Sequence, residues 1–539
     1  MKLGHSRVWL PGMLVALLLA ALPAEAAGPP RPAATPARKA SLDSRIHELL
    51  ADPEVARGFW GIEVVSVATG KTLYSSNADK LFTPASNTKL FTTAAALALV
   101  GPDYRFHTTV ESAATLDKYG RLSGDLVLVG RGDPNLSGRT LPYNLKTERK
   151  PPYLKALEAL ADQVVQKGVK YIDGDVVADD SYYAFERYGE GWAQDDLTWE
   201  YGAPVSALTL NDNVLFLTVM PGDRAGEKAF VTLEPFPDYY RVDNRILTTP
   251  AGSGPRRFAL NRQPGSDQLT LWGSIPADDN GATESVAIED PAGFAARLFH
   301  RMLENRGVAI YGRARARHSD LAAFPTFTVT AVASAGGGAT SSVPSSPRTM
   351  VLAGYDSQPL ADDLRVINKV SQNLHAELAL RMLGREKGSG GTIEGGLDVV
   401  RTFLTTVGLK PQEYALFDGS GLSRQNLVTP HAVVALLRYA AAQPWFARYR
   451  DTLPTAGVDG SLAERFKGTP AAGNVTAKTG SLGHVNVLSG YARTANGELV
   501  AFSVMSNNHN LADGRAIATI DQIVLAIVDD ETYPTAAKK

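Results

Sequence analysis

The chain has 539 residues, of which 44% are hydrophobic and 20% are charged, and 54 basic residues nearly balance 56 acidic ones. This length exceeds one ordinary hydrophobic core and predicts several units, or one domain that carries insertions. The near-zero net charge gives no electrostatic footprint for nucleic acid or anionic lipid, and the absence of cysteine excludes disulfides, a cysteine nucleophile and thiolate metal sites.

The N-terminus resembles an export signal. Lys2 precedes a short apolar run at 13–22, and small residues lead to Ala26. The run is too short to span a bilayer, so we expect residues 1–26 to be a cleaved signal peptide. The mature chain would then carry no transmembrane anchor and would reside in the periplasm. Residues 27–40, rich in proline and alanine, are predicted to form a flexible tether.

The next segment alternates between helical and strand patterns. Helical periodicity begins at Ser41, and alternating apolar residues between 60 and 77 predict a β-hairpin. The stretch "TPASNTKLFTTAAAL", residues 83–97, predicts a small-residue helix, which should end at Gly101-Pro102.

Short β-like runs dominate from about 105 to 335, with one helical stretch predicted at 153–168. A Gly/Ser/Pro-rich linker at 333–348 marks the clearest boundary. Beyond it, helices are predicted at 360–383, 393–407 and 430–442. The chain closes with a hairpin turning at Asn496-Gly497 and a helix whose apolar stripe should face the core.

This order indicates an insertion in one α+β domain. We predict an antiparallel sheet flanked by helices, built from residues 41–106 and 345–539. The inserted region, 107–344, should form two β-rich modules, with the inner one at about 205–285.

Ser86 and Lys89 form an S-x-x-K pattern at the start of a predicted helix. A lysine three residues on shares a helical face with the serine, and in a dry cleft it could lose its proton and take one from Ser86. Taken alone, the pattern more often marks a helix cap and a solvated lysine.

Two further motifs strengthen the first. Lys478-Thr479-Gly480 begins a predicted strand, where a cation and a hydroxyl could hold a substrate carboxylate and the glycine would admit a ligand against the backbone. Ser371 and Asn373 precede a helix and can point into a cleft. S-x-N also occurs elsewhere, but only Ser371 falls between the other two motifs.

Taken together, the ordered motifs resemble those of the penicillin-recognising serine enzymes. They are Ser86-x-x-Lys89, Ser371-x-Asn373 and Lys478-Thr479-Gly480. About 285 residues separate the first motif from the second, which resembles the class C low-molecular-mass penicillin-binding proteins. Such proteins are D-alanyl-D-alanine carboxypeptidases that also act as endopeptidases, so peptidoglycan stem peptides are the implied substrates and β-lactams the implied inhibitors.

The resemblance implies a role for each motif. Ser86 would be acylated by the penultimate D-Ala, and Lys89 would act as the general base. Ser371 would relay a proton to the leaving amine, and Asn373 would hold the substrate backbone and Lys89. No cofactor or metal is implied.

The third motif and its flank would bind substrate. Lys478 and Thr479 would hold the terminal carboxylate beside Gly480. The backbone N–H groups of Ser86 and Ser481 would form the oxyanion hole.

The resemblance also implies a second site for the charged groups of the stem peptide. Asp179 (or Asp180), in the inserted region, matches its acidic position, and Arg424 matches its basic one. An Asx turn and a surface arginine explain these residues equally well. Gly483 departs from relatives that carry a polar side chain there, which puts the stem preference in doubt.

Several alternatives compete with this interpretation. A serine triad lacks a base in context, because His375 and His484 fit packed or solvated positions better, and metal hydrolysis lacks its motifs. A β-lactamase on the same scaffold is disfavoured by the missing E-x-x-L-N segment and by Ser371, where class C β-lactamases have tyrosine. A non-catalytic wall-binding scaffold need not retain all the motif residues.

Overall fold

The structure, a computed structural model, describes residues 40–141, 143, 149–236, 238–323, 349–512 and 514–531. The predicted signal peptide, nearly all of the tether, and the linker at 333–348 lie outside these residues. No helix in the described ranges combines the length and apolar character needed to cross a membrane.

A five-stranded sheet joins the two ends of the chain. Its order is β2-β1-β23-β22-β21, and every neighbouring pair is antiparallel. The strands are β1 (Phe59–Ser66), β2 (Thr72–Ser76), β21 (Thr476–Leu482), β22 (Val485–Arg493) and β23 (Leu499–Asn507). The first hairpin therefore pairs with the last one, which confirms the predicted insertion in one antiparallel domain.

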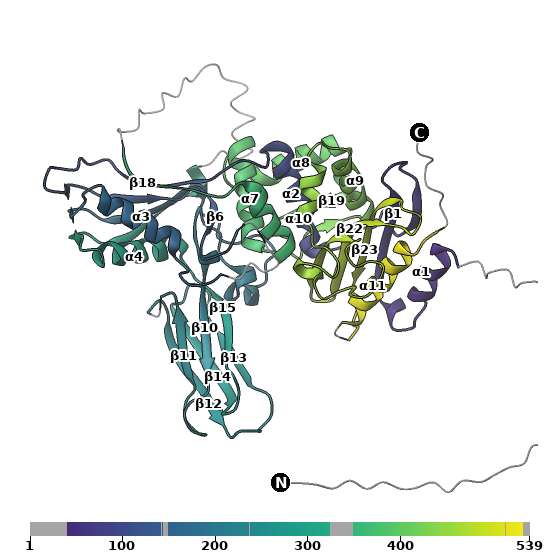
Figure 1. Cartoon of the computed structure of the whole chain (residues 1–539), viewed down its shortest axis with the longest axis horizontal. Helices are drawn as coiled ribbons and strands as arrows, with labels where there is room; N and C mark the ends of the chain where they lie inside the picture. Colours follow the sequence, from purple (N-terminus) through teal and green to yellow (C-terminus); the bar gives the residue numbers. More distant parts are fainter. Residues whose placement is uncertain are drawn as a thin grey trace, which may run out of the picture. The chain divides into compact units, whose positions relative to one another are not determined.

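Helices cover both faces of this sheet (Figure 1). On one face, α1 and α11 share an apolar core with the strands; on the other, α2, α7, α8 and α9 form a second core. Their bounds are α1 (Leu42–Leu50), α2 (Thr88–Leu99), α7 (Asn373–Lys387), α8 (Ile393–Val407), α9 (Pro430–Ala441) and α11 (Arg515–Val528). Two shorter helices, α6 (Leu360–Arg365) and α10 (Phe446–Thr452), precede α7 and follow α9 along the chain.

Local sequence signals account for most of these boundaries. The side chain of Ser41 accepts a hydrogen bond from Ser44 N at the start of α1, and Thr429 caps α9 ahead of Pro430 in the first helical position. Gly497 has a φ of 85° in the turn between β22 and β23, a left-handed conformation that glycine adopts readily.

The predicted helix at 360–383 is interrupted. After α6, a π-helical segment, Val366–Val370, ends at Ser371, whose φ of 67° is left-handed, and α7 begins at Asn373. A left-handed residue cannot continue a right-handed helix, so the break places Ser371 at a corner.

The inserted region begins with a mixed five-stranded sheet in the order β17-β8-β5-β3-β18. The strands are β3 (His107–Ser112), β5 (Leu126–Val129), β8 (Val176–Ala184), β17 (Ala314–Ser319) and β18 (Met350–Asp356). Two helices, α3 (Lys155–Gln166) and α4 (Pro291–Glu304), share its apolar core. The sequence analysis missed α4, although Asp290 caps it and proline follows in the first turn.

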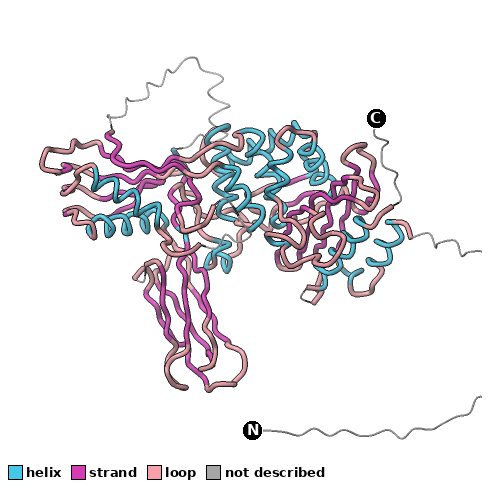
Figure 2. Tube along the Cα trace, viewed as in Figure 1, coloured by secondary structure: helices cyan, strands magenta, loops and turns pink. Residues whose placement is uncertain are grey.

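Two three-stranded sheets form the inner part of this region, which Figure 2 shows as strands and loops. They contain β10 (Val214–Met220), β11 (Phe230–Glu234) and β15 (Ala282–Ala287), and β12 (Arg241–Thr249), β13 (Arg257–Asn261) and β14 (Gln268–Pro276). The remaining strands of the described residues are short: β4 (Arg121–Leu122), β6 (Asp133–Leu136), β7 (Tyr171–Ile172), β9 (Leu208–Leu210), β16 (Ala309–Ile310), β19 (Tyr414–Ala415) and β20 (Leu427–Val428).

The domain boundaries stay predictions. Because β18 pairs with β3 inside the sheet of the inserted region, we favour a second boundary near residue 357 rather than 345.

Candidate active site

Ser86 lies in a 3-10 turn, Ala85–Asn87, that leads into α2. Ala85 has a φ of 46°, a left-handed conformation that costs energy for alanine. Asn87 ties the turn to the sheet, because its Nδ2 donates to Ser489 Oγ on β22 at 2.6 Å. The turn that carries the serine is thus anchored to the sheet.

Gly480 explains how closely the edge strand approaches this turn. A Cβ at this position would lie 2.9 Å from Ser86 N and 2.6 Å from a methyl carbon of Val487. The glycine therefore makes room for the serine turn itself, whereas the sequence suggested that it makes room for a ligand.

Lys89 is fully buried, and its ammonium nitrogen has three close neighbours. Its Nζ lies 2.9 Å from Ser86 Oγ, 2.6 Å from Asn373 Oδ1 and 2.6 Å from the carbonyl oxygen of Ser420. The first two motifs therefore meet at this amine.

Burial lowers the pKa of Lys89 to about 7, although the carboxylates of Asp418 and Glu377 partly oppose the shift. A neutral amine has two N–H donors and one lone pair. If its two N–H groups donate to Asn373 Oδ1 and to the carbonyl oxygen of Ser420, the lone pair faces the Ser86 hydroxyl and can accept its proton.

Glu377 on α7 holds the loop whose carbonyl group contacts Lys89. Its Oε1 accepts the backbone N–H groups of Gly419 and Ser420 at 3.0 and 2.9 Å, which orients the loop whose carbonyl meets Lys89. The side chain of Arg381 pairs with the same carboxylate. The sequence analysis missed both Glu377 and Ser420, because neither belongs to a motif.

The second and third motifs meet at another buried amine. Lys478 Nζ donates to Ser371 Oγ at 2.8 Å and to the carbonyl oxygen of Thr479 at 2.9 Å. Burial, followed by the charge of Lys89, lowers the pKa of Lys478 well below its usual range. A bound carboxylate would favour its charged form again.

A cavity of about 470 Å³ opens onto this cluster. It is lined by Ser86, Asp195, Asp196, Tyr201, Ser371, Asn373, Gly421, Leu422, Arg424, Ser481, Leu482 and Gly483. Thr479 is not among the lining residues, and its hydroxyl is 2.7 Å from that of Ser461. The hydroxyls of Ser86 and Ser371 and the amide of Asn373 thus line one cavity, with the buried amines in contact behind them, an arrangement that suits nucleophilic attack on an amide carbonyl.

The structure places Asp179 away from this cavity. Its carboxylate pairs with Arg317 at 3.0 Å, and neighbouring Asp180 contacts His318 and Ser206. Arg424 does line the cavity, and its nearest carboxylate is that of Asp196, at 3.9 Å. Strand β8 places Asp179 and Asp180 beside β17. The carboxylate near Arg424 is therefore that of Asp196, and not that of Asp179 as the sequence predicted.

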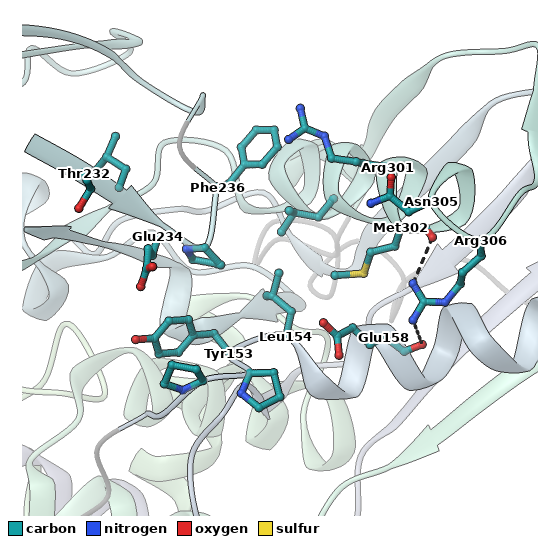
Figure 3. Close-up of a pocket in the computed structure, with 15 residues that line it drawn as sticks. Tyr153, Leu154, Glu158, Thr232, Glu234, Phe236, Arg301, Met302, Asn305 and Arg306 are labelled. Carbon is teal, nitrogen blue, oxygen red and sulfur yellow. Dashed lines mark hydrogen bonds between the residues drawn. The ribbon is translucent and has the colours of Figure 1, made fainter.

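A larger cavity of about 660 Å³ lies in the inserted region (Figure 3). Its floor includes Leu154, Phe236 and Met302, and Arg306 donates to the backbone oxygens of Glu158 and Met302 beside it. None of the motif residues lines it. Within the described ranges, no cluster of three or more metal-ligating side chains was found.

The fold and the cluster together define a serine hydrolase of the penicillin-recognising class. An antiparallel sheet between two helical layers brings Ser86 and the S-x-N segment to one cavity, and two buried lysines contact them from beneath its surface.

The chain belongs to the D-Ala-D-Ala carboxypeptidase 3 (S13) family, whose sequence profile matches residues 42–323 and 332–526. It is 36% identical over 488 residues to a D-alanyl-D-alanine carboxypeptidase of an Actinomadura species, covering 88% of this chain and 83% of that protein. It is 26% identical to the D-alanyl-D-alanine carboxypeptidase DacB of Haemophilus influenzae, covering 81% and 83%.

A solved structure shares the fold. Penicillin binding protein 4 (dacB) from Haemophilus influenzae aligns with a TM-score of 0.73 at 24% identity, covering 89% of this chain and 97% of that one. These findings confirm the resemblance to class C low-molecular-mass penicillin-binding proteins, and the chain is a serine-type D-Ala-D-Ala carboxypeptidase.

Proposed function

We propose that the enzyme removes the terminal D-Ala from peptidoglycan stem peptides through an acyl-enzyme on Ser86. The contact between Ser86 Oγ and Lys89 Nζ, at 2.9 Å, carries this proposal. In the neutral form, Lys89 takes the hydroxyl proton as the oxygen attacks the carbonyl carbon of the penultimate D-Ala. The backbone N–H groups of Ser86 and Ser481 stabilise the resulting oxyanion.

The leaving amine then needs a proton. Ser371 gives its hydroxyl proton to this amine and takes one from the charged form of Lys478, whose Nζ lies 2.8 Å from that hydroxyl beside the same cavity. The peptide bond breaks, terminal D-Ala departs, and water hydrolyses the ester to regenerate Ser86. Asn373 holds both Lys89 and the substrate backbone, while Lys478 and Thr479 bind the terminal carboxylate.

The finer features of this function are also proposals. An endopeptidase action would cut cross-linked stems by the same steps, with a second stem as the leaving amine. The substrate fits an exported enzyme that acts in the periplasm after loss of residues 1–26. A β-lactam should acylate Ser86; a solved complex of the Haemophilus influenzae relative holds one.

Labelling with a fluorescent penicillin tests the proposal. We expect stable labelling of the wild type, none of Ser86→Ala, and a mass increase of the intact protein equal to the antibiotic. Ser253→Ala, which changes an exposed serine between β12 and β13 outside the cavity, serves as the control and should label normally. Equal labelling of wild type and Ser86→Ala would contradict the acyl-enzyme.

The products distinguish the remaining alternatives. Release of D-Ala from defined stem peptides supports the carboxypeptidase, and cleavage of cross-linked muropeptides supports the endopeptidase. Rapid turnover of the penicillin without peptide cleavage would instead support a β-lactamase.

A further inference from the structure

Asp212 is a fully buried carboxylate in the inserted region and belongs to none of the motifs. It occupies the middle of a turn in which Asn211, Asp212 and Asn213 all have left-handed φ values of 49°, 54° and 55°. Asn and Asp adopt this conformation more readily than other non-glycine residues, but normally singly, so three in succession persist only where their surroundings hold them. Asn213 Nδ2 contributes by donating to the carbonyl oxygen of Pro204 at 2.8 Å.

The turn directs this carboxylate toward cations from two parts of the chain. Arg139 pairs with it, Arg149 Nη1 lies 3.0 Å from its Oδ2, and His375 Nε2 lies 3.2 Å from its Oδ1. Burial raises the pKa of Asp212, but these cations outweigh burial and hold it well below its usual range. A buried charge with this many partners strongly resists displacement.

Asp212 also contacts the segment that carries the second motif. Gln372 Nε2 donates to Asp212 Oδ2 at 3.0 Å, while Gln372 Oε1 accepts the backbone N–H of Leu374 and so caps α7. Gln372 lies between Ser371 and Asn373. One side chain thus links the buried carboxylate to the start of the catalytic helix.

The second contact reaches the same helix one turn further on. His375 on α7 is fully buried and bridges Asp212 to Asp363, with its Nδ1 2.7 Å from Asp363 Oδ1. Asn373 is held from the inserted region as well, because its Nδ2 donates to the carbonyl oxygen of Tyr201 at 2.8 Å.

We propose that Asp212 is a positioning residue: through Gln372 and His375, the inserted region holds Ser371 and Asn373 in their catalytic geometry. The inference rests on the proposed function. Ser371 has a left-handed φ, so its position depends on such restraints. A shift of about 1 Å in a catalytic group costs on the order of 100-fold in rate.

The test uses Asp212→Asn, which preserves shape and removes the charge. We expect kcat for D-Ala release and the rate of penicillin acylation to fall about 10- to 100-fold, while KM changes less than about threefold. The matched control is Asp180→Asn, which alters a buried carboxylate of the same region that contacts His318 and Ser206 but no motif residue. This control should lose comparable thermal stability and keep the wild-type rate within about twofold.

A reversed pair provides a rescue. In Asp212→Asn combined with Gln372→Glu, the amide and carboxylate exchange places, so the hydrogen bond and the total charge are retained. We expect this double variant to recover at least about tenfold of the lost acylation rate. A purely structural loss would not respond to this exchange.

If Asp212→Asn fails to fold, Gln372→Met removes the link to α7 without removing the charge and should lower kcat in the same way. The proposal is overturned if folded Asp212→Asn or Gln372→Met acylates at the wild-type rate, if the Asp180→Asn control slows equally, or if the double variant stays as slow as the single one. Failure of the wild type to acylate at Ser86 would instead refute the proposed function.

Discussion

At Lys89, burial sets the protonation state of the group that we propose as the general base. A solvated lysine is charged at neutral pH and cannot accept a proton from serine. Complete burial lowers the pKa to about 7, so a large fraction of the amine is neutral under ordinary conditions. The alternative of a solvated lysine beside a helix cap does not fit these contacts.

The first prediction concerns this pKa. Because the neutral amine is the active form, the second-order rate constant of penicillin acylation should rise with pH and level off above about 7. At pH 5 we expect a rate about 100-fold below the plateau. Stopped-flow labelling between pH 5 and 9, with circular dichroism to verify folding, measures it. A rate that is constant below pH 7 would argue against Lys89 as the base.

The second prediction concerns Gly480. Alanine there would place a Cβ 2.9 Å from Ser86 N and Pro84 O, so strand and serine turn must separate. We expect Gly480→Ala to slow penicillin acylation at least about tenfold and to cost about 1–3 kcal/mol of stability. Thermal melting and labelling rates report both effects.

Gly483 offers the matched comparison, because a Cβ at this nearby position meets nothing within 4 Å. Gly483→Ala should keep the wild-type melting temperature. Equal destabilisation by the two substitutions would show that the close approach at Gly480 is not the cause.

At the scale of elements, α7 carries buried charged side chains at positions where its sequence pattern predicts a hydrophobic core. His375 lies on the buried side of this helix, as a packed histidine would, yet it contacts Asp212 and Asp363. Burial lowers its pKa, but the two carboxylates outweigh burial and raise the pKa to about 9. His375 is therefore a buried cation that joins α7, α6 and the inserted region.

The third prediction follows from this shift. A pKa raised above the unfolded value of about 6.5 stabilises the fold fully below that pH, and the stabilisation is lost as pH rises through about 9. The free energy of unfolding should therefore decrease between pH 7 and 10. Urea titrations of wild type and His375→Gln measure it, and the variant should show a shallower decrease. Identical slopes for the two proteins would contradict a charged His375.

At the scale of the whole molecule, the cavity is assembled from distant segments. Asp195, Asp196 and Tyr201 come from the inserted region, while Arg424 comes from the loop before α9. The inserted region therefore forms one wall of the cavity. We propose that Asp196 and Arg424 bind the free amino and carboxylate groups of the stem peptide.

The fourth prediction tests this wall. Asp196→Asn should raise KM about tenfold for stem peptides whose third residue carries a free amine, because a charge-assisted contact is lost. Acylation by benzylpenicillin, which lacks that amine, should change less than about twofold. Asp179→Asn, remote from the cavity, serves as the control. An equal loss for both ligands would place Asp196 in catalysis instead of specificity.

Sequence alone determined most of the local structure and predicted the reactive groups. Helix caps, Asn496-Gly497 and alternating strands act over a few residues, so their signals were readable without coordinates. The ordered motifs at Ser86, Ser371 and Lys478 were readable too, since each needs its residue types at short spacing.

Tertiary structure decided which distant groups meet these motifs. Asp196 rather than Asp179 lies near Arg424. The Ser420 carbonyl contacts Lys89 and the Asp212 carboxylate contacts Gln372, although neither residue belongs to a sequence motif. Such contacts depend on how strands turn and sheets pack, so the spacing of residues along the chain does not predict them. Burial likewise exists only in the folded state, and it is burial that brings the pKa of Lys89 near neutrality.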